Sequence, residues 1–271
     1  MRIYRYLELM KHVILILLFL GLGYELQAQT TIAVLGTLHL RSARFNPDSI
    51  LEVMNRFKPD VILMELDTSL MDGQGNLKGR AISIDQNEEV AMKQYKNVNP
   101  VVQIRRFDIE YRNHYYESHK TFATEAQLDK AVDSLWKNNG LSRESMQIIS
   151  TLNRVSSAID ILADMGITSI NSKEYKQMAE FRQNWMYKKR LAVIAHTPAL
   201  HEYYDFYKDD GEFWDIRNKR MIINIANYAK VFKGKKILVL TGAMHTYYLT
   251  IGLKPLQTGF DFKLVDPPLS N

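Results

Sequence analysis

Continuous apolar runs alternate with helix-like segments along the chain, and this pattern predicts an α/β fold. The runs Thr31–Leu35, Val61–Met64 and Ile237–Thr241 are almost entirely aliphatic, which is typical of strands buried on both faces. After the first run, Asn46 offers an N-cap, Pro47 suits the first helical position, and apolar residues follow at helical spacing. A strand, a helix and a second strand in this order are typical of a βαβ unit with parallel strands.

The rest of the chain adds weaker strands and long helical stretches. Val101–Ile104 predicts a third strand, Asp261–Val265 a last edge strand and Glu212–Phe232 a long helix. The segment Asp72–Gly79 holds three glycines and indicates a loop. From about residue 110 to about residue 210 the pattern is polar and helical, so we expect a helical insertion there. Residues 29–271 are therefore expected to form a single α/β domain, with a mainly parallel central sheet flanked by helices and with this insertion in the middle.

Residues 1–28 have the pattern of a secretory signal peptide. Basic Lys11 precedes the apolar run Val13–Gly23, and the small residue Ala28 stands before a polar stretch, so we expect cleavage after Ala28. A start at Met10 would leave this signal intact. The apolar run is shorter than the roughly 20 residues that span a bilayer, so we expect no stable membrane insertion after cleavage, with an uncleaved anchor as the alternative. The mature protein is expected in the periplasm or outside the cell.

Composition excludes several classes of function. Hydrophobic residues make up 46% and charged residues 24% of the chain, which is ordinary for a globular protein. The chain has no cysteine, which excludes thiol chemistry and leaves histidine and oxygen atoms as the only strong metal ligands. The net charge is +5, but the basic clusters Arg105-Arg106, Lys188–Arg190 and Lys233–Lys236 are short. We assign them to helix ends or loops and expect no nucleic-acid partner.

Three sequence motifs with residues that could take part in chemistry share one position, the carboxyl end of a buried strand. They are Gly36-Thr37-Leu38-His39, Glu65 directly after Val61–Met64, and Gly242-Ala243-Met244-His245. Ligands bind at that edge of a parallel sheet, and each glycine lets the chain turn so that the histidine returns over the strand end. His39, Glu65 and His245 together are a ligand set typical of zinc or another transition metal. Each alone is more often an ordinary loop histidine or a salt-bridged carboxylate, so the prediction rests on their combination. We expect both histidines at a loop edge rather than in the packed core.

Arg217 is a further candidate on the long helix Glu212–Phe232. It shares a helical face with apolar residues, so its guanidinium needs a buried carboxylate or a bound anion, and Glu65 and Asp108 are the expected partners. The alternative is that Arg217 extends along the surface into solvent. Asn218 follows and is expected to bind substrate or to cap a strand end.

These motifs resemble the TraB/PrgY/GumN–TIKI family, within a group that includes erythromycin esterase-like enzymes and ChaN-like haem-binding proteins. The resemblance rests on the two Gly-x-x-His motifs at His39 and His245, on Glu65, and on Arg217-Asn218 in a late helix. It spans most of residues 29–271, but the middle third matches no motif of the family. It implies an α/β fold with duplicated βα halves and a site where both motifs meet. It does not settle the chemistry, because relatives include metallopeptidases, metal-free esterases and haem binders.

Three functions remain open from the residues. The first is metal-assisted hydrolysis of a peptide or an ester, in which His39, Glu65 and His245 hold a divalent ion such as Mn, Co or Zn. Arg217 and Asn218 would then stabilise the oxyanion or the carboxylate of the substrate. The second is a metal-free hydrolase, in which one histidine is the general base for water and Glu65 orients it or shares the proton transfer. The third is a haem- or metal-binding protein without turnover, for which the 15 tyrosines offer axial ligands. The sequence does not determine the oligomeric state.

Overall fold

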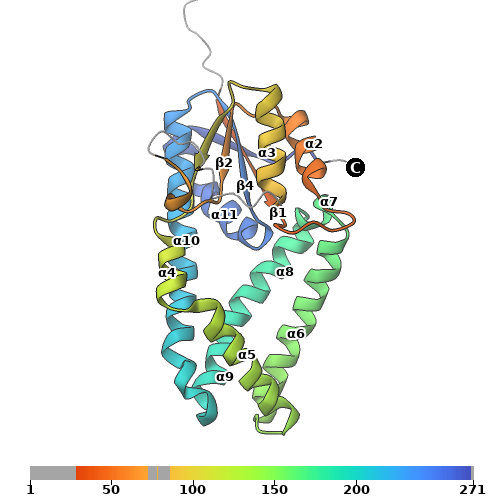
Figure 1. The fold of residues 1–271 in the computed structure, drawn as a ribbon, viewed down its shortest axis with the longest axis vertical. Helices are drawn as coiled ribbons and strands as arrows, with labels where there is room; N and C mark the ends of the chain where they lie inside the picture. The colour runs from red at the N-terminus through yellow and green to blue at the C-terminus, as the bar shows by residue number, and fades with distance from the viewer. Residues whose placement is uncertain (1–28, 73–77, 79–85, 270–271) are drawn as a thin grey trace, which may run out of the picture.

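One parallel sheet organises the fold (Figure 1). The computed structural model describes residues 29–72, 78 and 86–269. Within these residues the sheet has five strands in the order β3-β2-β4-β1-β5. Every pairing in it is parallel. The strands are β1 (Thr30–Thr37), β2 (Val61–Met64), β3 (Gln103–Arg106), β4 (Lys236–Gly242) and β5 (Phe262–Val265). The predicted α/β class and mainly parallel sheet are therefore confirmed.

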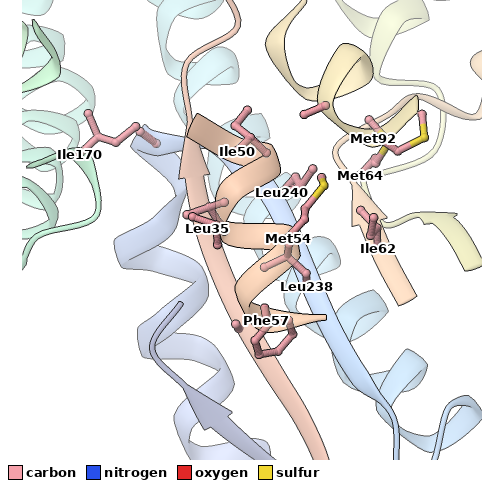
Figure 2. Close-up of a cluster of buried hydrophobic side chains, with 14 of the residues drawn as sticks. Leu35, Ile50, Met54, Phe57, Ile62, Met64, Met92, Ile170, Leu238 and Leu240 are labelled. Atoms are coloured by element: carbon pink, nitrogen blue, oxygen red, sulfur yellow. The ribbon is translucent and has the colours of Figure 1, made fainter. Parts of the chain in front are cut away.

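Helices cover both faces of the sheet. On one face lie α2 (Pro47–Phe57) and α3 (Asn87–Val98), which pack Met54, Phe57 and Met92 against strand residues such as Leu35 and Leu240 (Figure 2). On the other lie α11 (Thr246–Leu253) and the second half of α10 (Tyr204–Val231). The chain enters α2 as predicted, because the Asn46 side chain accepts hydrogen bonds from the backbone N–H groups of the first turn.

The helical insertion extends from the carboxyl edge of the sheet (Figure 1). It has a small apolar core of its own, built around Leu128, Val193 and Tyr207. Its helices are α4 (Arg112–Ser118), α5 (Thr121–Lys137), α6 (Arg143–Asp164), α7 (Ile167–Ile170), α8 (Lys173–Asn184), the π-helix η2 (Trp185–Arg190), α9 (Leu191–His196) and the 3₁₀ segment η3 (Pro198–Tyr203). Shorter elements elsewhere are η1 (Thr68–Leu70), η4 (Ala243–His245), η5 (Lys254–Leu256) and α12 (Gln257–Phe260).

Several predicted boundaries were wrong. The third strand runs over Gln103–Arg106 rather than Val101–Ile104, because residues 99–102 form a turn after α3. Arg105 and Arg106 therefore lie in an edge strand and not at a helix end or in a loop; charges there discourage pairing with a further strand. The long helix starts at Tyr204 instead of Glu212, because it continues through Gly211. A Cβ atom on Gly211 would lie only 3.0 Å from the ring of Tyr187, so glycine suits this position in the helix.

Other predictions lie partly outside the described residues. The predicted signal peptide over residues 1–28 lies wholly outside them, as does most of the predicted loop Asp72–Gly79. In the part of the chain that is described, no helix is both long enough and apolar enough to cross a membrane.

Candidate active site

Strand register brings the predicted site residues to one edge of the sheet. In β1 and β4, Gly36 pairs with Thr241 and Thr37 with Gly242, so the two Gly-x-x-His motifs begin one residue apart along the sheet. Met64 at the end of β2 pairs with Leu240, which places Glu65 beside Thr241. The next strand, β3, leads into Asp108 at the same edge. Four neighbouring strands thus deliver His39, Glu65, Asp108 and His245 to a single site.

The two motifs pack against each other at Gly36. A Cβ atom on Gly36 would lie 2.7 Å from Cγ2 of Thr246 and 3.2 Å from Cα of Ala243, so only glycine fits at this contact. The Asn171 side chain fixes the same residue, because its Oδ1 accepts from Gly36 N–H at 2.7 Å and its Nδ2 donates to Gly36 C=O at 3.0 Å. The first glycine is therefore a packing residue that holds the motifs together.

Gly242 has a different environment. A Cβ atom there would lie 3.7 Å from Glu65 Oε2, 3.7 Å from His245 Cδ2 and 3.8 Å from His39 Nε2. The side chains of the three predicted site residues therefore surround the Cα of Gly242, and the lack of a side chain leaves space between them. A cavity of about 20 Å³, lined by His39, Glu65 and Gly242 among others, adjoins this position and has room for a water molecule.

His39 forms a carboxylate–imidazole pair that sequence reasoning missed. Its Nδ1 lies 2.8 Å from Oε1 of Glu88 on the first turn of α3, and the same oxygen accepts from the Thr37 hydroxyl at 2.6 Å. The Glu88 side chain is 9% exposed and that of His39 is 54% exposed. The hydrogen bond to Glu88 raises the pKa of His39 to about 9, although burial opposes this shift. The pair therefore leaves Nε2 facing the space over Gly242.

His245 differs from His39 in that its surroundings lower the pKa of the imidazole. Asn218 Nδ2 donates to Trp214 C=O at 2.7 Å, which turns its Oδ1 toward His245 Nδ1 at 2.8 Å. Nδ1 must then carry the proton, so Nε2 is a lone-pair nitrogen. Burial lowers the pKa of His245 to about 4; the Glu65 charge opposes the shift and the Arg217 charge adds to it. The imidazole is consequently neutral at physiological pH.

The expectation that both histidines lie at a loop edge was wrong for His245. This residue is 5% exposed, and its ring stacks on Trp214 with centroids 4.2 Å apart. The short η4 turn directs it back under the helical insertion, where α10 covers it.

Arg217 links the carboxylates of β2 and β3. Its Nε and Nη2 donate to the two oxygens of Asp108 at 2.8 and 2.9 Å, and Nη2 also donates to Glu65 Oε1 at 2.5 Å. Burial alone would lower the pKa of Arg217, but the charges of Glu65 and Asp108 raise it, so the guanidinium remains charged. Asp108 also accepts from Arg112 at 2.7 Å. Both expected carboxylate partners of Arg217 are thus present, and the alternative of a solvent-directed side chain is not observed.

Glu65 has donors at both oxygens. Oε2 accepts from the Thr241 hydroxyl at 2.7 Å and from Gly242 N–H at 2.8 Å, while Oε1 faces Arg217. Burial favours its neutral form, but interactions with His245, Arg217 and the Thr241 hydroxyl outweigh burial and lower its pKa. Since neutral His245 contributes no charge, Arg217 and the two hydrogen bonds keep Glu65 ionised at neutral pH. Its carboxylate is therefore fixed in place and cannot take up a proton easily.

Two further residues define the surroundings. Arg217 Nη1 donates to the hydroxyl of Tyr116 on α4 at 3.3 Å and also lies 3.3 Å from His245 Nε2. Asn218 is fully buried and both ends of its amide are engaged, so it orients His245 and does not reach a substrate. The predicted direct role of Asn218 in binding substrate or oxyanion is corrected accordingly.

The geometry does not fit a metal held by His39, Glu65 and His245. Metal ligands direct their donor atoms to one point, at about 2.0–2.3 Å for zinc. Here His245 turns Cδ2 toward the space over Gly242, and its Nε2 faces the cationic Arg217. Glu65 already accepts hydrogen bonds at both oxygens. Among the described residues, no group of three or more histidines or carboxylates has an arrangement that would hold a metal ion.

The sequence offered no sign of three of these residues. Glu88 lies in the first turn of a helix, where acidic residues are common for reasons of helix stability, and nothing in its spacing points to His39. Tyr116 and Trp214 resemble ordinary core aromatics in sequence. Next to Tyr116, the ring of Tyr115 stacks on both His119 and Phe213.

Comparison with known proteins does not extend these observations. No family model, no curated protein and no solved structure matches the chain. The resemblance to the TraB/PrgY/GumN–TIKI family therefore remains a hypothesis based on the motifs.

Proposed function

We propose that this protein is a hydrolase of carboxylic esters or peptides in which His39, paired with Glu88, activates water. The observation that carries the proposal is the direction of His39: Nδ1 is held by a buried carboxylate, and Nε2 faces an open space beside Glu65. A carboxylate that fixes one imidazole nitrogen and leaves the other toward a reactant is the arrangement of a general base. Of the three open functions, the metal-free hydrolase has the strongest support.

The proposed reaction begins with water over Gly242. His39 Nε2 accepts a proton as the water oxygen forms a bond to the carbonyl carbon, and the Glu88 carboxylate stabilises the resulting imidazolium. The same Nε2–H then donates its proton to the leaving oxygen or nitrogen as the bond to carbon breaks. Glu65 Oε2, 3.7 Å from the Cβ position of Gly242, is placed to orient the water.

Tyr116 and Arg217 are placed to stabilise the oxyanion. The Tyr116 hydroxyl accepts from Arg217, so its own hydrogen remains available to donate. Burial raises the pKa of Tyr116, which keeps this hydrogen in place at neutral pH. A neutral donor polarised by a guanidinium is suited to a negative charge that develops during the reaction.

Activity of metal-stripped protein tests the proposal. Chelator-treated mature protein (residues 29–271) should hydrolyse at least one member of a panel of esters and peptides, and His39→Gln should lower that activity by about 10²–10⁴-fold. His196→Gln is the matched control, because His196 is exposed and bonds only the backbone of its own helix among the described residues. Loss of activity in the control, or full activity in His39→Gln, would contradict the assignment of His39.

Metal-assisted hydrolysis remains the second candidate. It is favoured by the lone pair on His245 Nε2 and by a His39 Nε2 that has no hydrogen-bond partner among the described residues, since imidazole nitrogens are common metal ligands. It requires Arg217 to leave its present position. Elemental analysis distinguishes the two: about one divalent ion per chain, with activity lost on its removal, would favour the metal. A Soret band in the visible spectrum would favour the haem-binding alternative.

We also propose that the protein is exported and related to the TraB/PrgY/GumN–TIKI group. The meeting of both Gly-x-x-His motifs with Glu65 and Arg217 supports the relationship. Strand β1 starts at Thr30, so cleavage after Ala28 would leave the sheet complete. N-terminal sequencing of protein from its native host should give a mature start near Gln29, and a full-length cytoplasmic form would exclude export.

A further inference from the structure

A second cavity, an open groove at the surface of the helical insertion, shares no lining residue with the active site. Its volume is about 660 Å³, within the range of roughly 300–1,000 Å³ that small-molecule sites occupy. The end of α5, one face of α6 and the π-helix η2 border it. Its lining includes two of the three tryptophans of the chain, Trp136 and Trp185.

The π-helix η2 positions Trp185 and Lys189 at this cavity. π-helical turns are rare and are often found at functional sites. The indole of Trp185 is fixed, because Nε1 donates to Ile148 C=O at 3.1 Å and the ring stacks on Phe181 with centroids 5.0 Å apart. Lys189 Nζ lies 6.0 Å from the centroid of the same ring. Trp136 is 39% exposed and offers a second flat apolar surface.

The charges around the cavity do not balance. Arg143, Arg154 and Lys189 line it, and Glu144 is the one carboxylate among the described lining residues. In the described part of the chain, none of the three cations takes part in an ion pair, whereas Arg112 and Arg217 at the active site are both paired. Arg143 and Arg154 are 11 positions apart on α6, a rise of about 16 Å. Unpaired cations that line a concave surface attract anions.

We propose that this cavity binds a small aromatic anion that carries more than one acidic group. The indoles provide surface for a flat apolar body, and the separated cations provide contacts for acidic groups at two or more positions. Among the described lining residues no nucleophile is hydrogen-bonded to a base, so we expect this cavity to bind its ligand without reaction. This inference does not depend on the proposed hydrolase activity.

The inference is tested with the mature protein (residues 29–271) and the fluorescent disulfonate 4,4′-dianilino-1,1′-binaphthyl-5,5′-disulfonate. Energy transfer from tryptophan and calorimetry should show saturable binding of about one molecule per chain. The uncharged N-phenyl-1-naphthylamine should bind at least about tenfold more weakly, because it offers no partner to the cations. Arg154→Gln and Lys189→Gln should each weaken the disulfonate about threefold to tenfold.

Substitutions of the indole and of a neighbouring lysine complete the test. Trp136→Ala should weaken binding, and Trp136→Phe, which keeps an aromatic ring, should restore most of it. Lys188→Gln is the matched control, since Lys188 is exposed on the same π-helix but does not line the cavity, and it should bind like the wild type. Unchanged affinity in the doubly substituted Arg154→Gln, Lys189→Gln protein, or equal affinity for the uncharged probe, would overturn the proposal. The charge variants should keep the wild-type melting temperature, because Arg154, Lys188 and Lys189 are exposed at the surface of the insertion.

Discussion

The two Gly-x-x-His motifs look alike in sequence but differ in almost every physical property. His39 is half exposed, is paired with Glu88 and has its pKa raised to about 9. His245 is buried, bonds Asn218 and has its pKa lowered to about 4. Gly36 is confined by packing, whereas Gly242 borders open space. Identical motifs at neighbouring strand ends have therefore been given different surroundings, and two titratable groups with pKa values moved in opposite directions are typical of an acid–base site.

The difference comes from what covers each strand end. α3 provides Glu88 to the first motif from one face of the sheet. α10 provides Arg217, Asn218 and Trp214 to the second from the other face and also buries it. In the proposed function, the first motif therefore contacts the reactants, and the second supports the site from behind.

Replacement of the two histidines should give the largest contrast. His39→Gln keeps a donor for Glu88 but removes the base, so kcat/KM should fall by about 10²–10⁴-fold with little change in stability. His245→Ala leaves a cavity beside Trp214 and an unpaired Asn218 Oδ1, so it should also lower the free energy of unfolding by about 2–4 kcal/mol. Denaturant unfolding and steady-state kinetics measure both effects. Equal loss of stability in the two variants would show that the comparison is wrong.

The two glycines should separate packing from chemistry. Gly36→Ala forces its methyl group to 2.7 Å from Thr246 Cγ2, and we expect a loss of about 1–3 kcal/mol of stability. Gly242→Ala meets its neighbours at ordinary contact distances, and φ −52° and ψ 133° suit alanine, so the fold should persist. Its methyl group occupies the space proposed for water, and activity should fall by roughly 100-fold. Thermal melting and kinetics of both variants test this, and an active Gly242→Ala enzyme would place the water elsewhere.

Sequence reasoning could place the main strands, the insertion and the meeting of the motifs, because these follow from apolar runs and from the geometry of parallel sheets. Arg217 was also predictable, since a cation on an apolar helical face needs a buried partner. The partners Glu88, Asn171 and Tyr116 were not, because each comes from a segment whose position relative to the sheet depends on tertiary packing. For the same reason, neither the inward turn of His245 nor the position of Arg217 beside its Nε2 could be predicted from the sequence.

Removal of the charge from Glu88 should reduce the contrast between the histidines. Glu88→Gln keeps an acceptor for His39 Nδ1–H but cannot stabilise the imidazolium, so the pKa of His39 should fall toward the ordinary value near 6.5. At pH 9 we expect kcat/KM to drop by about tenfold, and near pH 7 by less, because more of the base is unprotonated. Kinetics across pH measure this. Gln127→Glu on the exposed face of α5 provides a control for a charge change elsewhere. A pH profile identical to that of the wild type would mean that Glu88 does not act on His39.

The pH dependence of the wild type should sharpen the comparison directly. Because the pKa of folded His39 is raised to about 9, its pairing stabilises the fold fully below about pH 6.5 and is lost as pH rises through 9. Because the pKa of folded His245 is lowered to about 4, the unfolded chain takes up that proton first, and stability falls as pH drops from about 6.5 toward 4. Imidazole resonances followed by NMR should therefore show one histidine titrating near pH 9 and another near pH 4, with the assignments made from His39→Gln and His245→Ala.

If His39 is the base, kcat/KM should also rise about tenfold per pH unit between pH 7 and 9. A rate that falls over this range would assign His39 as the general acid instead, and titration of both rings near pH 6.5 would remove the distinction between the motifs.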